Sequence, residues 1–574
     1  MNRLAALLKI RQGEGRTASL LIGLMIFASA GITIGSTGVD ALFFARFGPQ
    51  NLPYMYLALG VTNFIGMLGV TALIGRVAHH RLFILIPFVF AIVLIIERVV
   101  LGLNLPWFMP IVWLLKELMN LVQGTYTWGL AGLFTDTRQA KRLFPLFTAG
   151  SIFGAVTGSF ATPLLVNWLN VDNLLIVWAI SLAITFILGR ILVARINTPS
   201  SKPRRSRKQQ PSLIQDMQSG YQFVKRSKLM TWWSIMAIIF SVLWFSIALP
   251  FSKAATAQFP NENALASFLA TFNGVQTAVA LLLSLFVANR LFARFGLINM
   301  LIVFPVIYLL GFAAMTAISI VTIVPFTIFI ALVTFKFIQM IYIQGVADTA
   351  WQAAFNVVPA QRRDQVRAFI NGVPGQAGIF IAGLILIIGE NALQPQWLYL
   401  IGLIAAISTV YFAIRSKRAY STALVDALRD GQPQVFITSD EEPFGGFRKD
   451  ATAINAAIDG LSNPDPAIRR VSIEILGRLG VPQATDALVA ALRDPDPQVR
   501  ADALRSLAGA KASAALLEIA ACLFDTEPEV RAEAVETLRI LAPNPEDLTA
   551  YIEPLLHDLM PSVRARVAAA LLSI

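Results

Sequence analysis

The feature that most constrains this chain is a series of long apolar stretches. A helix needs about 20 predominantly apolar residues to cross the hydrocarbon core of a bilayer. Twelve stretches reach that length, and we predict a membrane-spanning helix at each. They cover residues 17–45, 52–74, 81–103, 106–133, 144–169, 174–194, 229–257, 265–288, 296–319, 323–352, 367–389 and 396–414.

Composition supports a membrane protein and excludes several other classes. Of the 574 residues, 56% are hydrophobic and 14% are charged, whereas soluble domains carry about 25% charged residues. The single cysteine, Cys522, excludes an intramolecular disulfide and a cysteine-based metal cluster. The sequence contains no Walker-type phosphate loop, and its three histidines are not placed for a metal site. We therefore expect no enzyme activity, no cofactor and no metal.

The distribution of charge predicts the orientation of the chain. Lys and Arg gather in alternate loops between the stretches, which by the positive-inside rule places both termini in the cytoplasm. The formal charge is +21 over residues 1–419 and −9 over residues 420–574. The positive charge therefore reflects topology, and we expect a lipid bilayer and no nucleic acid as partner. The first stretch is too long for a cleaved signal peptide, so we predict a multi-pass protein of the plasma (inner) membrane.

An internal repeat divides the twelve stretches into two groups of six. The segment from Trp128 to Ser159 resembles the segment from Trp351 to Gly383 at an offset of 225 residues. Two parallel six-helix halves are the layout of the major facilitator fold. The aligned identical residues are Arg142 with Arg367, Phe144 with Phe369, Gly150 with Gly375, and Gly158 with Gly383.

We predict an all-α chain of five parts. They are a first membrane half (1–194), a basic cytoplasmic linker (195–228), a second membrane half (229–418), a joint (419–449) and a soluble solenoid (450–574).

Two lysines inside the predicted spans are the strongest candidates for a substrate site. Ionisable residues within a membrane are rare, and most face the bundle interior or an aqueous cavity. Lys116 lies in the fourth stretch and Lys336 in the tenth, 220 residues apart, which is close to the repeat offset. In this fold the first and fourth helices of each half line the central cavity. We therefore expect both lysines to bind an anionic substrate.

Polar residues near the lysines extend this hypothesis. Asn120 and Gln123 follow Lys116 on the same helix face, and Gln339 follows Lys336 by three residues. We expect these three side chains to line the substrate path. The alternative is that the lysines pair with carboxylates such as Glu117 and only hold helices together.

Three charged residues are candidates for gating or coupling. Asp40 and Lys253 occupy matching places near the outer ends of the first and seventh stretches, so they could form an outer gate pair. A static ion pair, or two residues facing headgroup water, is the alternative. Asp40 or Glu117 could instead carry a proton.

One run of residues resembles a known family. Trp128-Gly129, then Gln139-Ala140-Lys141-Arg142-Leu143-Phe144-Pro145-Leu146-Phe147, then Gly150 resembles the ATP/ADP translocases of plastids and intracellular bacteria. The resemblance implies a major-facilitator-like fold and an exchanged, nucleotide-like anion. The family places a lysine before a Gly-Ser-Ser run in its first span, whereas Ile34 precedes Gly35-Ser36-Thr37 here.

The C-terminal region contains a repeat of 31 residues. Asn463-Pro464-Asp465-Pro466 recurs as Asp494-Pro495-Asp496-Pro497 and as Asp525-Thr526-Glu527-Pro528, with a divergent copy near Pro561. Each copy precedes an apolar helical pattern, and such periods indicate an α-solenoid. The pattern resembles HEAT repeats, in which Asp and Arg can form a ladder between neighbouring repeats. We expect this acidic solenoid to lie near basic inner loops such as Lys202–Lys208 and to offer a surface for a possible protein partner.

These observations predict a secondary transporter of an organic, nucleotide-like anion that works by exchange or gradient coupling. A proton-coupled transporter of another small molecule or lipid is the first alternative. The second is a non-transporting membrane scaffold that uses its HEAT repeats.

Overall fold

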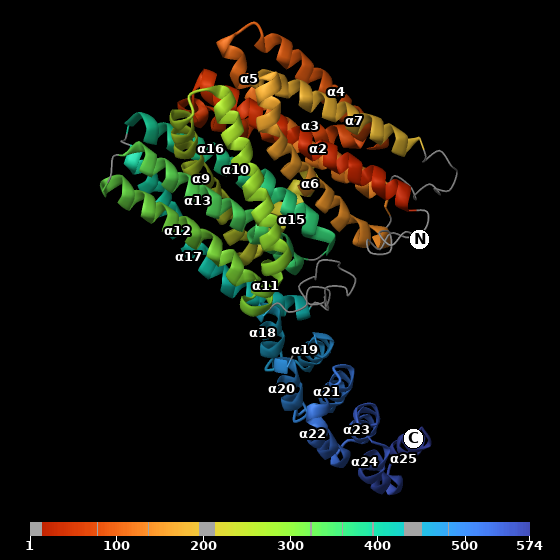
Figure 1. Cartoon of the computed structure of the whole chain (residues 1–574). Coiled ribbons are helices and arrows are strands. Elements are labelled where there is room, and N and C mark those ends of the chain that lie inside the picture. Colours follow the sequence, from red (N-terminus) through yellow and green to blue (C-terminus); the bar gives the residue numbers. More distant parts are fainter. Residues whose placement is uncertain are drawn as a thin grey trace.

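The computed structural model shows a bundle of long helices from which a curved stack of short helices extends at one end (Figure 1). It describes residues 14–76, 79–135, 137–194, 213–321, 324–358, 360–392, 395–429, 451–479, 482–542 and 544–573. Within these ranges the regular elements are all helical, as the sequence predicts. We call the end of the bundle that carries the stack the HEAT end, and the opposite end the far end.

The membrane region contains helices at each of the twelve predicted places. Ten are long and apolar enough to cross a membrane. The other two, α3 (Leu52–Arg76) and α5 (Met109–Leu133), have 25 residues each, or about 37 Å of helix. The first half also contains α2 (Gly15–Leu42) with η1 (Phe43–Phe47), α4 (His79–Leu101), α6 (Thr137–Leu169) and α7 (Leu174–Val193).

The second half repeats this order of helices. It consists of α9 (Lys228–Gln258), α10 (Glu262–Leu283) with η5 (Ser284–Ala288) and α11 (Asn289–Phe295), α12 (Leu297–Val321), α13 (Pro325–Tyr342) with η6 (Ile343–Ala347) and α14 (Asp348–Ala354), α15 (Ala360–Gly372), α16 (Pro374–Ala392) and α17 (Pro395–Arg429).

Two parts of the predicted connections are helical. The range expected as a linker, 195–228, contains α8 (Leu213–Arg226), which packs on α9 and α15. The last membrane helix, α17, continues to Arg429, into the range expected as a joint. Lys202–Lys208 lies outside the described residues.

Two helix pairs join the halves, namely α6 with α10 and α3 with α16. Glycines allow this close approach, as they commonly do between membrane helices. A methyl group on Gly274 of α10 would lie 2.8 Å from Ser159 of α6, and one on Gly383 of α16 would lie 3.0 Å from the backbone of α3. Within the first half, Gly154 of α6 lies against the Ile26 carbonyl of α2.

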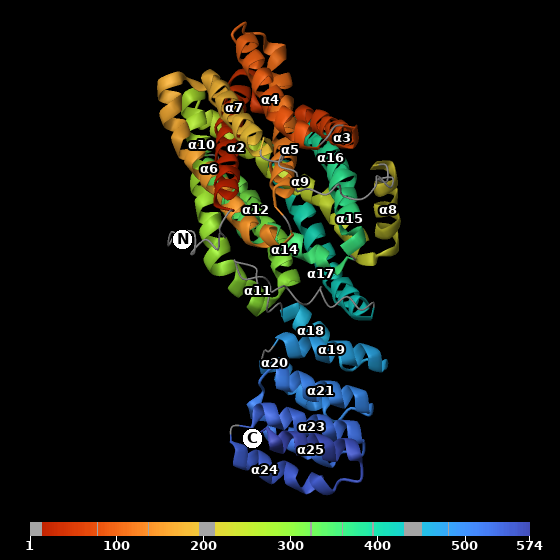
Figure 2. The ribbon, with the colours of Figure 1, turned by 90° about the vertical axis from the view of Figure 1, so that its right-hand side faces the viewer.

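The C-terminal region is a solenoid whose helices stack in parallel (Figure 2). Four helices begin with proline at the first helical position, as the repeat pattern predicts, because proline there gives up no helical hydrogen bond. They are α19 (Pro466–Leu479), α21 (Pro497–Gly509), α23 (Pro528–Leu541) and α25 (Pro561–Leu572). The helices between and before them are α18 (Ala451–Gly460), α20 (Pro482–Ala491), α22 (Leu516–Ala521) and α24 (Pro545–Ile552).

An arginine–aspartate ladder links neighbouring repeats, as expected. Each arginine donates two hydrogen bonds of 2.7–2.9 Å to the aspartate of the next repeat, in the pairs Arg469–Asp494, Arg500–Asp525 and Arg531–Asp558. Each arginine also donates to the backbone carbonyl six residues earlier. The hydrogen bonds from Arg531 lower the pKa of the Asp558 carboxyl.

The solenoid is rooted in the second half of the bundle. Helix α18 contacts α11, α12 and α17, and α19 also contacts α17. Buried side chains of both regions form one continuous core, in which Ile454 and Ala457 belong to the solenoid and Phe292 and Tyr420 to the bundle.

We expect Gly154→Ala to lower the stability of the membrane region. The added methyl group would lie 2.2 Å from the Ile26 carbonyl oxygen, so α2 and α6 must separate, at a cost of about 1–3 kcal/mol. The matched control is Gly124→Ala, because a methyl group there meets nothing within 4 Å and alanine favours helix by up to about 1 kcal/mol. Thermal unfolding of the purified protein in detergent should move in opposite directions for the two variants.

We expect Arg500→Gln to loosen the solenoid at the junction of α21 and α23. Loss of the bidentate contact to Asp525 should cost about 1–3 kcal/mol of local stability, which corresponds to roughly five- to 150-fold faster amide exchange. Hydrogen–deuterium exchange of the full-length protein measures this change. Exposed Arg493 supplies the control variant Arg493→Gln, and equal exchange in the two variants would show that the ladder does not stabilise the stack.

Candidate functional site

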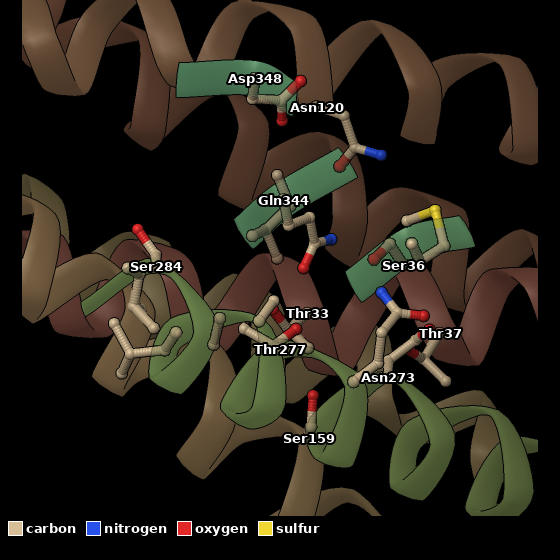
Figure 3. Close-up of a pocket in the computed structure, with 17 residues that line it drawn as sticks. Thr33, Ser36, Thr37, Asn120, Ser159, Asn273, Thr277, Ser284, Gln344 and Asp348 are labelled. Atoms are coloured by element: carbon tan, nitrogen blue, oxygen red, sulfur yellow. The ribbon is translucent and has the colours of Figure 1, made fainter. Parts of the chain in front are cut away.

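A cavity of about 680 Å³ lies between the two halves (Figure 3). The first half contributes α2, α5 and α6, and the second half contributes α10, η5, α13, η6 and α14. A volume of this size suits a small organic ligand. The cavity also touches both halves, which is where transporters of this architecture bind their substrates.

The cavity wall is rich in neutral hydrogen-bonding groups. Hydroxyl and carboxamide side chains converge from both halves (Figure 3), and they are Thr33, Ser36, Thr37, Asn120, Ser159, Asn273, Gln276, Thr277, Ser284 and Gln344. Asp348 is the one charged side chain among the described residues that line the cavity. Such a wall can bind the edges of a base or the hydroxyls of a sugar.

Part of this wall has a sequence signal that our sequence reasoning missed. On α10, Asn273, Gln276, Thr277 and Ser284 follow the spacing of one helix face. This polar stripe lies on the eighth predicted span, whereas we searched only the first and fourth helices of each half. Asp348 was missed because it lies close to the end of its span.

A π-helical turn, η6, ends directly before Asp348. Such turns are rare and are often found at functional sites, because the extra residue re-aims the side chains that follow. Here the turn contributes Gln344 to the cavity, and Asp348 follows one residue after it ends.

Of the five predicted substrate residues, Asn120 lines the cavity. The other four lie behind or beyond the wall. Gln123 is buried and donates to the carbonyl of Ala28 at 2.8 Å. Gln339 is buried and donates to the hydroxyl of Tyr308 at 2.6 Å.

Lys116 lies in an ion-pair cluster beyond the cavity. Its ammonium is 2.8 Å from Asp40 and 2.5 Å from Glu117, and only 4% of its side chain is exposed. The indole of Trp113 donates to the same oxygen of Asp40 at 3.0 Å. The structure therefore pairs Asp40, the predicted gate residue, with Lys116, while Lys253 is half-buried on α9.

Lys336 has different surroundings. Its ammonium lies 4.5 Å from the centre of the Trp244 ring, which is a favourable cation–π position. The described part of the chain places no carboxylate in ion-pair distance of it. Lys336 precedes the cavity residue Met340 by one helical turn, on the same face of α13.

The far end of the bundle is closed by an ion pair between the halves. Arg46 of η1 donates to both carboxylate oxygens of Glu262 on α10, at 2.9 and 2.8 Å, and also to Asp172 at 2.8 Å. The Val171 backbone donates to Asn263 beside this contact, at 3.1 Å. The cavity therefore lies on the HEAT side of a closed contact.

Ile34 stands where the translocases place a lysine, and it is buried in α2. Its neighbours Thr33, Ser36 and Thr37 line the cavity instead. The wall here is therefore formed by hydroxyl groups.

Comparison with known proteins identifies the C-terminal region. The family model for HEAT repeats matches residues 444–508 and 485–572. The solenoid expected from the 31-residue period is therefore a HEAT-repeat region.

The membrane region is similar to a nucleotide carrier in sequence. ADP,ATP carrier protein 1 of Chlamydia pneumoniae is 23% identical over 227 residues, which covers 36% of this chain and 43% of that protein. The chain thus matches less than half the length of this relative. The match confirms the resemblance found in the sequence.

Solved transporters share the fold of the membrane region. A bacterial homologue of the iron transporter ferroportin in its inward-facing state has a TM-score of 0.51 at 14% identity, covering 70% of this chain and 98% of that one. The nucleoside transporter NupG has a TM-score of 0.51 at 14% identity, covering 69% and 99%. These relatives are transporters rather than enzymes, and the expected major-facilitator fold of this integral membrane protein is confirmed.

Proposed function

We propose that this chain is a secondary transporter that carries a nucleotide-like solute across the membrane by alternating access. The observation that carries the proposal is the polar cavity between the halves, which ends below a closed ion pair at the far end. The relative in Chlamydia pneumoniae is named as an ADP,ATP carrier, and this supports the choice of solute. We take the HEAT end as cytoplasmic and the membrane as the plasma membrane, because the basic loops lie at that end.

One helix supplies a charge gradient along the cavity. Lys336, Met340, Gln344 and Asp348 follow one another at four-residue steps, so the lysine and the aspartate are about 18 Å apart along the axis. Base and sugar would bind the neutral wall, with donor groups toward Asp348. The phosphate would reach toward Lys336, the predicted anion-binding residue that is free of carboxylates among the described residues.

Lys116 takes a different role in this proposal. It was expected to bind the anion, but its ammonium already contacts two carboxylates. We therefore assign Lys116 to the link between α2 and α5, which was the alternative interpretation of its position.

The HEAT repeats would bind a protein partner. Exposed apolar side chains near the tip of the solenoid, Leu517, Phe524 and Leu559, support this proposal, because large apolar groups that gather on a soluble surface often mark an interaction site.

We expect cavity substitutions to weaken transport. Asn120→Ala and Thr277→Val should each raise the apparent KM for labelled ADP about fivefold to tenfold, because each removes hydrogen bonds worth about 1 kcal/mol. Uptake into proteoliposomes preloaded with unlabelled ADP or adenosine measures this. The matched control is Thr271→Val, since Thr271 lies on α10 outside the cavity lining and bonds the Ser267 carbonyl. Failure of the unaltered protein to take up ADP or adenosine would contradict the choice of solute.

We expect Lys336→Met to discriminate between charged and neutral solutes. Loss of the ammonium should weaken uptake of ADP about tenfold or more, because a charged hydrogen bond contributes about 1.5–3 kcal/mol, and should leave uptake of adenosine within about twofold. Exposed Lys228 at the start of α9 supplies the control Lys228→Met. Equal losses for both solutes would remove Lys336 from phosphate recognition.

A further inference from the structure

We propose that Asp40, Lys116 and Glu117, which we call the charge cluster, bind one proton that drives solute movement. The inference rests on the proposed transport function and names its coupling ion and its coupling site. It begins from a charge imbalance inside the membrane, where one lysine contacts two carboxylates.

The contacts define how the cluster can be neutral. Asp40 Oδ1 and Glu117 Oε1 both lie against the same Lys116 nitrogen, at 2.8 and 2.5 Å. With both carboxylates ionised, the cluster carries one uncompensated negative charge in an apolar bundle, which is unfavourable. Two close carboxylates disfavour double ionisation and share a proton as a pair. Uptake of one proton by either carboxyl group balances the lysine.

Exposure shows which members of the cluster a proton can reach. The Lys116 side chain is 4% exposed, whereas Asp40 and Glu117 keep 31% and 27% of their side-chain surface accessible. The lysine is thus a sealed counter-charge, and the two carboxylates are the groups open to protons.

The cluster lies between the cavity and the closed far end. Ser36 and Thr37 line the cavity about one turn before Asp40, and Asn120 lines it one turn after Lys116. In the other direction, Arg46 of the far-end ion pair lies six residues beyond Asp40, or about 9 Å along the helix. A proton site in this place can face the far side when that ion pair opens, and can face the cavity when it closes.

The groups that surround Asp40 are consistent with this assignment. Lys116, Glu117 and Trp113 face it from α5, and Tyr56 faces the two carboxylates from α3. Helix α7 meets this part of α2 through Leu174 and Trp178, which do not ionise. Asp172 of the adjacent η4 is bound to Arg46.

Proton binding can be measured without any solute. In infrared difference spectra of the purified full-length protein between about pH 8 and pH 5.5, we expect a protonated-carboxyl band that ordinary exposed carboxyls, with pKa values near 4, do not produce. Asp40→Asn leaves one lysine with one carboxylate, so this variant should fold and mimic the protonated cluster, and Glu117→Gln should do the same. Each variant should lose the band, whereas Glu518→Gln on the exposed solenoid surface should keep it. A band that is unchanged in both cluster variants overturns the proposal.

Coupling is tested by accumulation in proteoliposomes, with the membrane potential held at zero. A gradient of one pH unit, acidic outside, should support about tenfold accumulation of labelled adenosine for one proton per solute. Asp40→Asn should reduce the ratio to about one while adenosine counterflow continues. Counterflow without any pH-driven accumulation by the unaltered protein overturns coupling. Absence of counterflow with both adenosine and ADP rejects the proposed function instead, and the infrared band still decides whether the cluster binds a proton.

Discussion

The membrane region depends on how it neutralises charge in an apolar interior. A lysine in a bundle of this kind must find a counter-charge or a polarisable surface, since an isolated ammonium is costly away from water. The two halves meet this requirement differently. Lys116 contacts Asp40 and Glu117, and the first of these contacts ties α5 to α2, whereas Lys336 lies over the ring of Trp244 and ties α13 to α9. One half therefore stores a balanced charge cluster, and the other keeps a cation beside the cavity.

Close packing is the second requirement, and small residues provide it. Between membrane helices there is little hydrophobic driving force, so association depends on contact area and hydrogen bonding. Gly31, Gly35 and Gly38 allow α2 to lie against Trp178, Ser181 and Leu174 of α7. The same device at Gly274 and Gly383 brings the halves together on either side of the cavity. The neutral cavity wall is possible because backbone packing, and not side-chain ion pairs, holds the helices around it.

The sequence predicted the architecture well because architecture follows from repeated patterns. Apolar length, alternating loop charge and the 31-residue period each recur many times, so single errors do not matter. The site was predicted less well. Periodicity placed Lys116 and Asn120 on one helix face, but it could not show that Asp40 and Glu117 occupy the lysine, since that contact depends on how α2 and α5 are rotated. The same limit hid the polar stripe of α10 and the turn that precedes Asp348, because a change from α- to π-helical winding has no residue pattern in this sequence.

The attachment of the HEAT repeats has a mechanical consequence. The solenoid shares a continuous core with α11, α12 and α17, so it behaves as an extension of the second half. A rocking movement that opens and closes the cavity would swing the whole arm about its root, and its tip would travel much farther than the helices that drive it. A protein held at that tip would be brought closer or moved away with each transport cycle, so that solute traffic could be read as a change in position on the same side of the membrane.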